Sequence, residues 1–585
     1  MIAAGRLWQP VLAAALLWLV LIQPNHPAAL TWGALRIVPL EWPVLLLGLV
    51  ALPARGAFAA ALRGMMVAVL LLLVLAKLAD FATFTAFLRP FNLLVDLHLV
   101  HAAWMLGSGS LGVPLALAAV VGGGLGLIGL AAALWWATGV WVRIAPPPLW
   151  RGGAALALLP AAALATAEIG QAMRAWSLPF TPPGAAFTAR VGVERALFYQ
   201  AALQDMDEFR REAAADAFAA ADPGHLLDRI GPTDVLILFV ESYGRSSFRN
   251  PLYAPTHTAT LAAAEARLAE QGLAMRSAFL TAPMVGGQSW LAHGTLATGL
   301  RTDNQRRYQA LLASPRRSLY HFAQAAGFHT AAVMPAITMA WPEADFFGFD
   351  TVLAAADLGY RGLPFNWVTM PDQFTLAALD RVLRRGAPGA DRAPLFAQVA
   401  LISSHAPWVP VPELVAWEEI GDGTVFDAMA TAGDPPDVVW RDHDRVRDQF
   451  RLAVDYALQT VGAYAERHAA APPLMLVLGD HEPAPFVSQV SGFDVPVHLI
   501  GPPELVDLVA DWGWTPGLLP EPEAPVWPME AFRDRFLAAF STAVPDLQTG
   551  LARPGDRTAG TIGKASPDLY AAGRGTSSPS DMTAE

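Results

Sequence analysis

The chain has 585 residues, a net charge of −12 at neutral pH and a mean hydropathy of +0.37, and its length allows several domains. It contains no cysteine, which excludes disulfides and thiolate metal sites, so any metal must be held by oxygen and imidazole ligands. The acidic balance argues against nucleic acid as a partner, because phosphate backbones require a cationic surface.

The first part of the chain is apolar and nearly uncharged. Eight Lys/Arg and four Asp/Glu precede Gly170, so this part carries +4 and the remainder −16. Five apolar runs have lengths near the roughly 17 to 25 residues of a bilayer helix. They cover residues 7–22, 37–52, 61–78, 113–140 and 152–167. The sequence therefore predicts an integral membrane part, residues 1–169, with about five transmembrane helices.

Two segments of the membrane part allow other interpretations. Residues 81–112 are apolar but interrupted by Pro90 and Asp96, which favours an interfacial or re-entrant helix over a further span. The first run resembles a signal peptide, but it lacks a small-residue cleavage site and further spans follow it, so we expect a retained helix.

The arginines of the membrane part predict its orientation. If Arg6 is cytoplasmic, an inner loop holds Arg55 and Arg63, and the next inner loop holds Arg143 and Arg151, in keeping with the positive-inside tendency. An odd number of spans then places the rest of the chain on the outer side of the membrane.

The remainder is predicted to contain three segments. Residues 170–232 form a linker whose part 194–221 is an amphipathic helix, ended by Pro223 and Gly224. Residues 233–547 alternate β-rich apolar runs with helical patterns, which indicates an α/β fold with a mainly parallel central sheet. The tail, residues 548–585, is rich in Gly, Ser, Thr and Pro and is predicted to be disordered.

Three apolar runs of this domain end in polar residues. Residues 234–240 precede Glu241, residues 395–402 precede Ser403, Ser404 and His405, and residues 474–478 precede Gly479, Asp480 and His481. In open α/β sheets the ligand crevice lies outside the carboxyl ends of the strands. The three runs therefore predict that Glu241, His405 and the Asp480-His481 pair meet at one sheet edge.

Glu241, Asp480 and His481 make an oxygen and nitrogen set suited to zinc or manganese. Each residue also has a structural explanation: Glu241 can cap a helix or pair with Arg245, and Asp480 with His481 can be a loop pair. His405 can contact substrate, bind a second metal or face solvent. Their convergence on one edge favours the metal site.

Ser289 lies in the run PMVGGQSWLAHGTLATGL at 283–300, after a Gly-Gly-Gln turn and before a short predicted helix. A serine there can cap the helix or act as a nucleophile, since a metal and the positive end of a helix both favour its alkoxide.

Four further histidines are individually expected to be structural or exposed. These are His257, His293, His329 and His498.

Three motifs carry a family resemblance over about residues 61–547. VLILFVESYGR (235–245), LISSHAPW (401–408) and LVLGDHEP (476–483) resemble motifs of the alkaline phosphatase and sulfatase superfamily. Within it, the chain resembles the lipoteichoic acid synthase-like group of membrane phosphoglycerol transferases, which have five membrane spans and an extracytoplasmic catalytic domain. The resemblance implies that Glu241, Asp480 and His481 are metal ligands and that His405 contacts substrate.

The resemblance extends to the nucleophile. Sulfatases carry Cys or Ser followed by Pro two and Arg four residues later, whereas Ser289 is followed there by Leu291 and His293. Without that Pro and Arg, the resemblance implies an unmodified serine hydroxyl and argues against sulfatase activity. The transferases usually carry threonine instead, and Thr295 and Thr298 are the alternatives in this run.

A further segment, 333–350, resembles the region that binds a glycerol phosphate headgroup through an aromatic residue and an arginine. Trp341 matches the aromatic residue, but Pro342 and Glu343 stand where the arginine is expected. The resemblance therefore implies substrate binding by Trp341 and leaves the headgroup open.

Together, the resemblance implies a bacterial enzyme of the cytoplasmic (inner) membrane, multi-pass, with its catalytic domain extracytoplasmic or periplasmic. It implies one divalent ion, manganese or zinc with magnesium as an alternative, held by Glu241, Ser289, Asp480 and His481. The expected reaction moves phosphoglycerol from a membrane phospholipid donor to an envelope glycan or polymer acceptor through a phosphoserine at Ser289. The alternatives are phosphoethanolamine transfer, a phosphatase or phosphodiesterase reaction, and an inactive membrane-tethered binding module.

Overall fold

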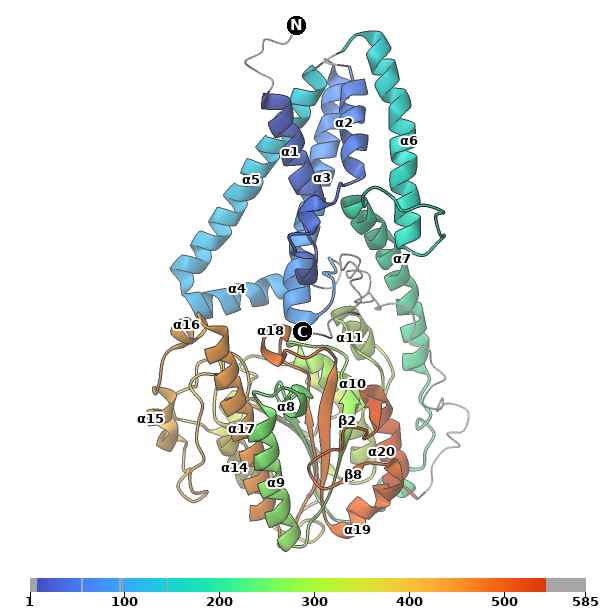
Figure 1. Ribbon diagram of the computed structural model, residues 1–585. Helices are drawn as coiled ribbons and strands as arrows, with labels where there is room; N and C mark the ends of the chain where they lie inside the picture. The colour runs from blue at the N-terminus through green and yellow to red at the C-terminus, as the bar shows by residue number, and fades with distance from the viewer. Residues whose placement is uncertain (1–7, 54–55, 94–95, 97, 145, 543–585) are drawn as a thin grey trace, which may run out of the picture.

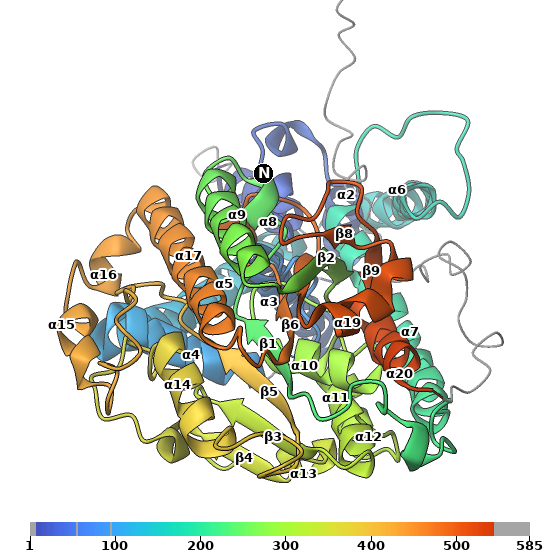
Figure 2. The ribbon, with the colours of Figure 1, turned by 90° about the horizontal axis from the view of Figure 1, so that it is seen from below.

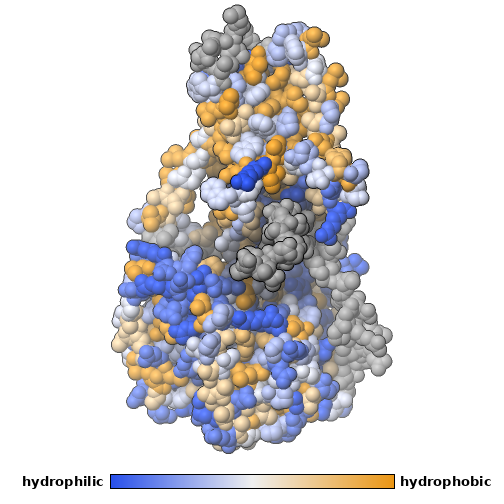
Figure 3. Space-filling view, viewed as in Figure 1, coloured by the Kyte–Doolittle hydropathy of each residue, from blue (hydrophilic) through white to orange (hydrophobic). Residues whose placement is uncertain are grey.

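The computed structural model describes residues 8–53, 56–93, 96, 98–144 and 146–542. Figure 1 shows an elongated helical part that leads into an α/β domain. In the space-filling view of Figure 3, apolar residues dominate the surface of the helical part and hydrophilic residues are concentrated on the α/β domain. The predicted tail, 548–585, lies outside the described residues.

The helical part contains the first seven α-helices. They are α1 (Trp8–Ile22), α2 (Glu41–Ala51), α3 (Ala57–Phe87), α4 (His98–Leu111), α5 (Val113–Arg143), α6 (Pro148–Ala172) and α7 (Phe187–Ala214). Among the described residues, α3, α5 and α6 are long and apolar enough to cross a membrane, judged by length and composition. These three helices correspond to three of the five predicted spans.

The other two predicted spans are shorter helices. Helix α1 has 15 residues and α2 has 11, below the length of an ordinary bilayer span. Helix α2 starts only after Pro39, and Leu52 leaves the helical conformation in front of Pro53, because a residue before proline is biased towards extended backbone. Apolar composition alone did not reveal these two boundaries.

The segment predicted as interfacial divides into two helices. Its first residues belong to α3, which continues to Phe87, whereas α4 runs across the direction of its neighbours (Figure 1). Figure 1 also shows that the last turns of α2 and α5 and the first turns of α3 and α6 lie at the end of the helical part remote from the α/β domain.

Helix α7 is the amphipathic helix predicted at 194–221, but it starts and ends seven residues earlier. Its first turns pack beside α1, α2 and α3, and its last turns reach α11 of the α/β domain (Figure 1). It therefore connects the two parts of the molecule.

The α/β domain is built on one mixed, mostly parallel sheet with the strand order β4-β3-β5-β1-β6-β7-β2-β8, and β9 pairs with β2. The strands are β1 (Val235–Val240), β2 (Ala274–Thr281), β3 (His329–Met334), β4 (Thr351–Ala354), β5 (Leu395–Leu401), β6 (Leu474–Gly479), β7 (Asp494–Gly501), β8 (Thr515–Pro516) and β9 (Val526–Pro528). The predicted α/β class is confirmed, and β7 is antiparallel to both β6 and β2.

The helices of this domain follow in chain order. They are α8 (Ser246–Arg249), α9 (Ala254–Glu270), α10 (Ser289–Thr298), α11 (Gln305–Leu312), α12 (Leu319–Ala325), α13 (Ala344–Phe347), α14 (Asp372–Leu383), α15 (Asp427–Ala430), α16 (Pro436–Val439), α17 (His443–Arg467), α18 (Pro485–Ser488), α19 (Pro503–Val506) and α20 (Phe532–Phe540).

Both faces of the sheet are covered by helices, which explains why β1 is apolar at every position (Figure 2). Leu236, Leu238 and Val240 lie in one core with residues of α9, α14 and α17. Ile237 and Phe239 lie in the other core, with residues of α10, α12 and α20. The three strands that the sequence singled out, β5, β1 and β6, are adjacent and parallel at the centre of this sheet.

Candidate active site

The carboxyl ends of β1 and β6 bring together an acidic and imidazole cluster. Val240 is in register with Gly479, so Glu241 and Asp480, which follow them, stand side by side. Nε2 of His481 lies 3.2 Å from Glu241 Oε1 and 3.7 Å from Asp480 Oδ2. Ligand atoms of these three buried residues all lie within 4.8 Å of one another.

The local backbone fixes each of these side chains. The amide of Ser242, which has a left-handed φ of 58°, donates to Asp480 Oδ1 at 2.8 Å, and its hydroxyl donates to Glu241 Oε1 at 2.9 Å. His481 Nδ1 lies 2.9 Å from the carbonyl oxygen of Glu482, so Nδ1 carries the proton of that bond and Nε2 faces the carboxylates.

The electrostatics of the cluster favour a cation. Burial opposes ionisation of Glu241, yet the charge of His481 holds the pKa of Glu241 far below its usual range, with a smaller contribution from His405. Burial and the charge of Glu241 raise the pKa of Asp480 to about 7. Burial alone would lower the pKa of His481, but the carboxylates of Asp480 and Glu241 raise it to about 9. A proton on His481 thus offsets the two carboxylates, and a divalent ion suits the same set of oxygen and imidazole donors.

Ser289 is the first residue of α10, and it reaches this cluster. Its Oγ donates to Glu241 Oε2 at 3.0 Å and lies 3.4 Å from His481 Nε2. The N-cap position belongs to Gln288, in a left-handed conformation with φ 67°, so the capping interpretation of Ser289 is wrong. The positive end of a ten-residue helix favours an anionic oxygen at this position.

The two alternative hydroxyls lie elsewhere. Thr295 and Thr298 are fully buried in α10, and their hydroxyls donate to the carbonyl oxygens of Leu291 and Gly294, each at 2.7 Å. Helical rotation carries both away from the cluster, as expected for residues six and nine positions after Ser289.

His405 follows β5 on the other side of β1. Its Nδ1 lies 2.6 Å from the carbonyl oxygen of Ala406. Ser404, the residue before it, donates to the carbonyl oxygen of Glu241 at 2.5 Å, and this bond fixes the β5 end against the β1 end. His405 is half-buried, and it lies close enough for its charge to act on Glu241.

Trp341 lies in the loop between β3 and α13. Its indole lies beside Tyr308, and its ring belongs to an aromatic cluster with Phe347 and Phe349. Burial and the nearby carboxylate of Glu343 raise the pKa of Tyr308, so Trp341, Tyr308 and Glu343 lie together. The substrate role of Trp341 stays a prediction.

The other predicted histidines have structural partners. His498 is buried between the hydroxyls of Ser277 and Tyr243, at 2.7 and 3.0 Å. His257 bonds the carbonyl oxygen of Arg451, and His329 lies 3.0 Å from the Thr351 hydroxyl. His293 packs against Phe239 with the two rings tilted by 43°, and burial lowers the pKa of His293 to about 4, which keeps the ring neutral.

Several supporting groups were not predicted from the sequence. Ser242 and Ser404 hold Glu241, and the buried carboxylate of Glu482 accepts the amide and hydroxyl of Ser246, at 2.8 and 2.7 Å. Asp372 accepts the amide of Ser403 at 2.9 Å, and burial raises its pKa to about 7. Ser242, Ser404 and Glu482 are adjacent in sequence to predicted site residues, and this adjacency is the feature of the sequence that could have indicated their role.

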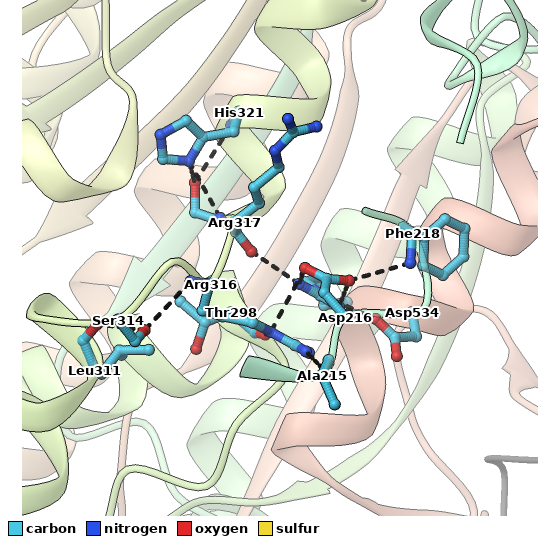
Figure 4. A network of polar contacts seen from close by, with 12 residues as sticks. Ala215, Asp216, Phe218, Thr298, Leu311, Ser314, Arg316, Arg317, His321 and Asp534 are labelled. Carbon is cyan, nitrogen blue, oxygen red and sulfur yellow. Dashed lines mark hydrogen bonds and ion pairs between the residues drawn. The ribbon is translucent and has the colours of Figure 1, made fainter. Parts of the chain in front are cut away.

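The far end of α10 is fixed by a buried ion network (Figure 4). Arg316 donates to the carbonyl oxygen of Thr298 at 2.8 Å and to that of Ala215, just after α7, at 2.6 Å. Arg533 pairs with Asp216 at 2.9 Å. Although burial alone would raise the pKa of Asp216, the hydrogen bond and charge of Arg533 hold it below its usual range. The helix that starts at Ser289 is thereby tied to the end of α7.

The sequence profile of the sulfatase family matches residues 233–494, the segment that carries the strands and the cluster described above. This segment is a domain of the sulfatase and alkaline phosphatase superfamily. A search of curated proteins found no match for the chain.

Solved structures give distant likenesses. The chain is similar to the lipoteichoic acid synthase LtaP from Listeria monocytogenes, with 13% identity and a TM-score of 0.35 over 58% of this chain and 79% of that one. It is similar to the Streptococcus pyogenes phosphoglycerol transferase GacH in complex with sn-glycerol-1-phosphate, with 10% identity and a TM-score of 0.36 over 64% and 91%. The zinc complex of the C-terminal periplasmic domain of EcEptC from Escherichia coli gives 14% identity and a TM-score of 0.35 over 54% and 83%.

Proposed function

We propose that the chain is a metal-dependent phosphotransferase that moves phosphoglycerol from a membrane phospholipid to a hydroxyl of an envelope glycan or polymer. The observation that carries this proposal is the hydroxyl of Ser289, which lies at the start of α10 and 3.0 Å from Glu241 in a buried cluster with His481. A serine at a helix start beside carboxylates and imidazole fits a nucleophile for phosphoryl transfer.

Glu241, Asp480 and His481 would hold one divalent ion, manganese or zinc, with the hydroxyl of Ser289 beside it. Such an ion, when bound, supplies Lewis-acid stabilisation of the phosphoryl oxygens. The donor set fits because Nε2 of His481 and the carboxylate oxygens converge, while Nδ1 of His481 already has a partner.

In the first half-reaction, Ser289 Oγ would attack the lipid phosphorus. The Oγ–P bond forms, the bond from phosphorus to the diacylglycerol oxygen breaks, and the serine proton leaves along the hydrogen bond to Glu241. His405, near Glu241, would supply a proton to the diacylglycerol oxygen. In the second half, the acceptor oxygen attacks the phosphoserine phosphorus, the acceptor O–P bond forms and the Oγ–P bond breaks. His405 would take the proton of the acceptor hydroxyl, and the proton on Glu241 would return to Ser289 Oγ, which regenerates the enzyme and gives ping-pong kinetics.

The membrane part supports a lipid donor. Three helices are long and apolar enough to cross a bilayer, and the end of one of them, α3, contacts the loop before Ser289. We propose that the chain is anchored in the bacterial cytoplasmic membrane, with residues 1–169 as the membrane part, 170–232 as the linker and 233–547 as the extracytoplasmic catalytic domain.

Phosphoethanolamine transfer is the second candidate, and one observation favours it. Glu343 lies with Tyr308 and Trp341, at the position where the phosphoglycerol group resemblance requires an arginine. A carboxylate next to an aromatic ring suits a cationic amine better than a neutral glycerol, because both groups attract a positive charge.

A transfer assay on the full chain in lipid vesicles tests both candidates. The vesicles carry phosphatidylglycerol or phosphatidylethanolamine labelled in the headgroup, with manganese and an alkyl glucoside as acceptor, and the Ser289→Ala variant is the control. We expect label on the glucoside together with free diacylglycerol, only with wild-type protein. Label released only as a free phospho-headgroup would indicate a phosphodiesterase. Equal rates for wild type and Ser289→Ala would refute the assignment of the nucleophile.

A further inference from the structure

The end of helix α3 lies directly against the loop that precedes Ser289. A Cβ atom built at Gly286 would stand 2.0 Å from the carbonyl oxygen of Ala86 and 3.5 Å from the ring of Phe87. At Gly287 the same ring would be 3.8 Å away. Glycine is required at position 286 for two reasons, its φ of +78° and this close approach of the membrane helix.

The length of α3 explains how it reaches this loop. At about 1.5 Å per residue, its 31 residues extend for about 46 Å, whereas the hydrocarbon core of a bilayer is about 30 Å thick. A helix of this length that crosses a bilayer extends beyond it, and Figure 1 shows that α3 ends at the α/β domain.

The contacted loop is joined to the segment that carries Asp480 and His481. Val285 forms a parallel bridge with Glu482, and the amide of Gly286 donates to the carbonyl oxygen of Glu482 at 2.8 Å. Helix α3 also contacts α18, which starts three residues after Glu482. The end of α3 thus lies over both segments of the candidate active site.

Helix α7 holds the end of α3 in this position. Arg195 of α7 pairs with Asp80 of α3 and donates to the carbonyl oxygen of Phe91, while Asp80 accepts the amide of Phe91 at 2.9 Å. Further along α7, Asp205 accepts a 2.9 Å bond from Nε of Arg307 in α11. The same helix is therefore bound both to the end of α3 and to the domain that contains Ser289.

We propose that the end of α3, Ala86 and Phe87, is a positioning element of the active site. It holds the Gly286-Gly287 turn and thereby keeps the Ser289 hydroxyl against Glu241. The inference rests on the proposed role of Ser289 as nucleophile. It makes the membrane part a component of the catalytic site in addition to an anchor, and a shift of α3 relative to the domain would lower the rate of the chemical step.

A matched pair of glycine variants of the full chain tests this proposal. Gly286→Ala introduces a Cβ at φ +78° that collides with α3, whereas Gly272→Ala introduces one at φ +83° with no described atom within 4 Å. Both substitutions place a side chain at a similar left-handed φ, so the comparison separates the collision with α3 from the strain of a positive φ. The measurements are kcat and KM for a water-soluble aryl phosphodiester, and the affinity for manganese.

We expect Gly286→Ala to lower kcat at least about tenfold relative to Gly272→Ala, with KM changed less than about threefold, because an interaction that positions the nucleophile acts on the transition state. Equal kcat values for the two variants would overturn the proposal. If the wild type turns over no phosphodiester, the proposed function fails. The manganese affinities still decide the inference in that case. About tenfold weaker manganese binding by Gly286→Ala than by Gly272→Ala supports the role of α3, and equal manganese binding by the two variants overturns it.

A second pair covers the case in which Gly286→Ala does not fold. Phe87→Ala removes the ring that faces the glycine turn, and Phe58→Ala removes an exposed ring at the opposite end of the same helix. We expect the kcat of Phe87→Ala to fall about tenfold and that of Phe58→Ala to stay at the wild-type value. Equal values for these two variants would overturn the proposal independently of the glycine pair.

Discussion

The hydroxyl of Ser289 donates a 3.0 Å hydrogen bond to the carboxylate of Glu241, which lies 48 positions earlier in the chain. Two separate structural features produce this contact. The parallel strands β1 and β6 bring Glu241 next to Asp480 and His481, and the Gly286-Gly287 turn directs the start of α10 towards them.

Replacing Ser289 by alanine should abolish turnover without loss of folding. The substitution removes the attacking oxygen, so we expect kcat to fall by at least about a thousandfold. Thr298→Val is the control, because its buried hydroxyl bonds only the helix backbone. Turnover is measured with labelled phospholipid and folding by thermal unfolding. A Ser289→Ala enzyme with a wild-type rate would contradict the account.

Removing the metal should remove activity reversibly. Treatment with a chelator is expected to stop turnover, and manganese or zinc should restore it. Asp480→Asn should weaken metal binding by at least about a hundredfold, because it deletes a charged ligand from a buried site. Asp448→Asn, at an exposed position paired with Arg451, should bind metal like the wild type in a calorimetric titration. Full activity in the presence of the chelator would be inconsistent with a metal site.

Trp341→Ala should affect substrate binding more than chemistry. The indole lies with Tyr308 and Glu343, and its proposed role is to hold the headgroup, so we expect KM for the phospholipid to rise about tenfold with kcat within about threefold. Trp417→Ala, which removes a tryptophan packed beside Arg467, is the control. If Trp341→Ala lowered kcat with KM unchanged, its assignment to headgroup binding would be wrong.

The network that ties α10 to the end of α7 should be essential for stability. Arg316→Ala removes the donor to the carbonyl oxygens of Thr298 and Ala215 and leaves both without this partner inside the protein (Figure 4). We expect a loss of about 3 kcal/mol in the free energy of unfolding. Arg441→Ala, whose side chain is 75% exposed, should change it by less than about 0.5 kcal/mol. Similar losses for both variants would contradict this role of Arg316.

Stability should depend on pH through His498. Burial lowers the pKa of His498 to about 3, whereas an unfolded histidine titrates near 6.5. Between these values the unfolded chain binds the extra proton, so the stability contributed by neutral His498 is complete above about pH 6.5 and is lost as the pH falls towards 3. The contribution is at most about 1.4 kcal/mol per pH unit. Denaturant unfolding of His498→Gln should show a correspondingly smaller pH slope, and an unchanged slope would disprove this effect.

The centre of the site was predictable because its residues come directly after apolar runs that predict buried strands. Apolar runs of five to eight residues predict buried strands, and parallel strands must end at one edge, so Glu241, Asp480 and His481 could be assigned to one place. The family motifs then indicated which chemistry these residue types serve.

The ends of the apolar helices could not be predicted, because apolar composition marks a span but not its ends. Helices α1 and α2 are shorter than expected, and α3 extends to Phe87. Contacts between distant segments could not be predicted either, because a local sequence pattern does not encode them. The contact of Ala86 with Gly286 joins positions 200 residues apart, and the glycine alone indicated only a turn. The link from Arg316 to Ala215 is likewise a tertiary contact.

The most direct test of the central claim is mass spectrometry of the full-length protein after brief incubation with phospholipid vesicles and manganese, quenched in acid. The account predicts a phospho-headgroup adduct on the peptide that contains Ser289, with a mass that identifies the headgroup, and no adduct in Ser289→Ala. An adduct on Thr295 or Thr298, or lipid turnover with no adduct on this peptide, would contradict it.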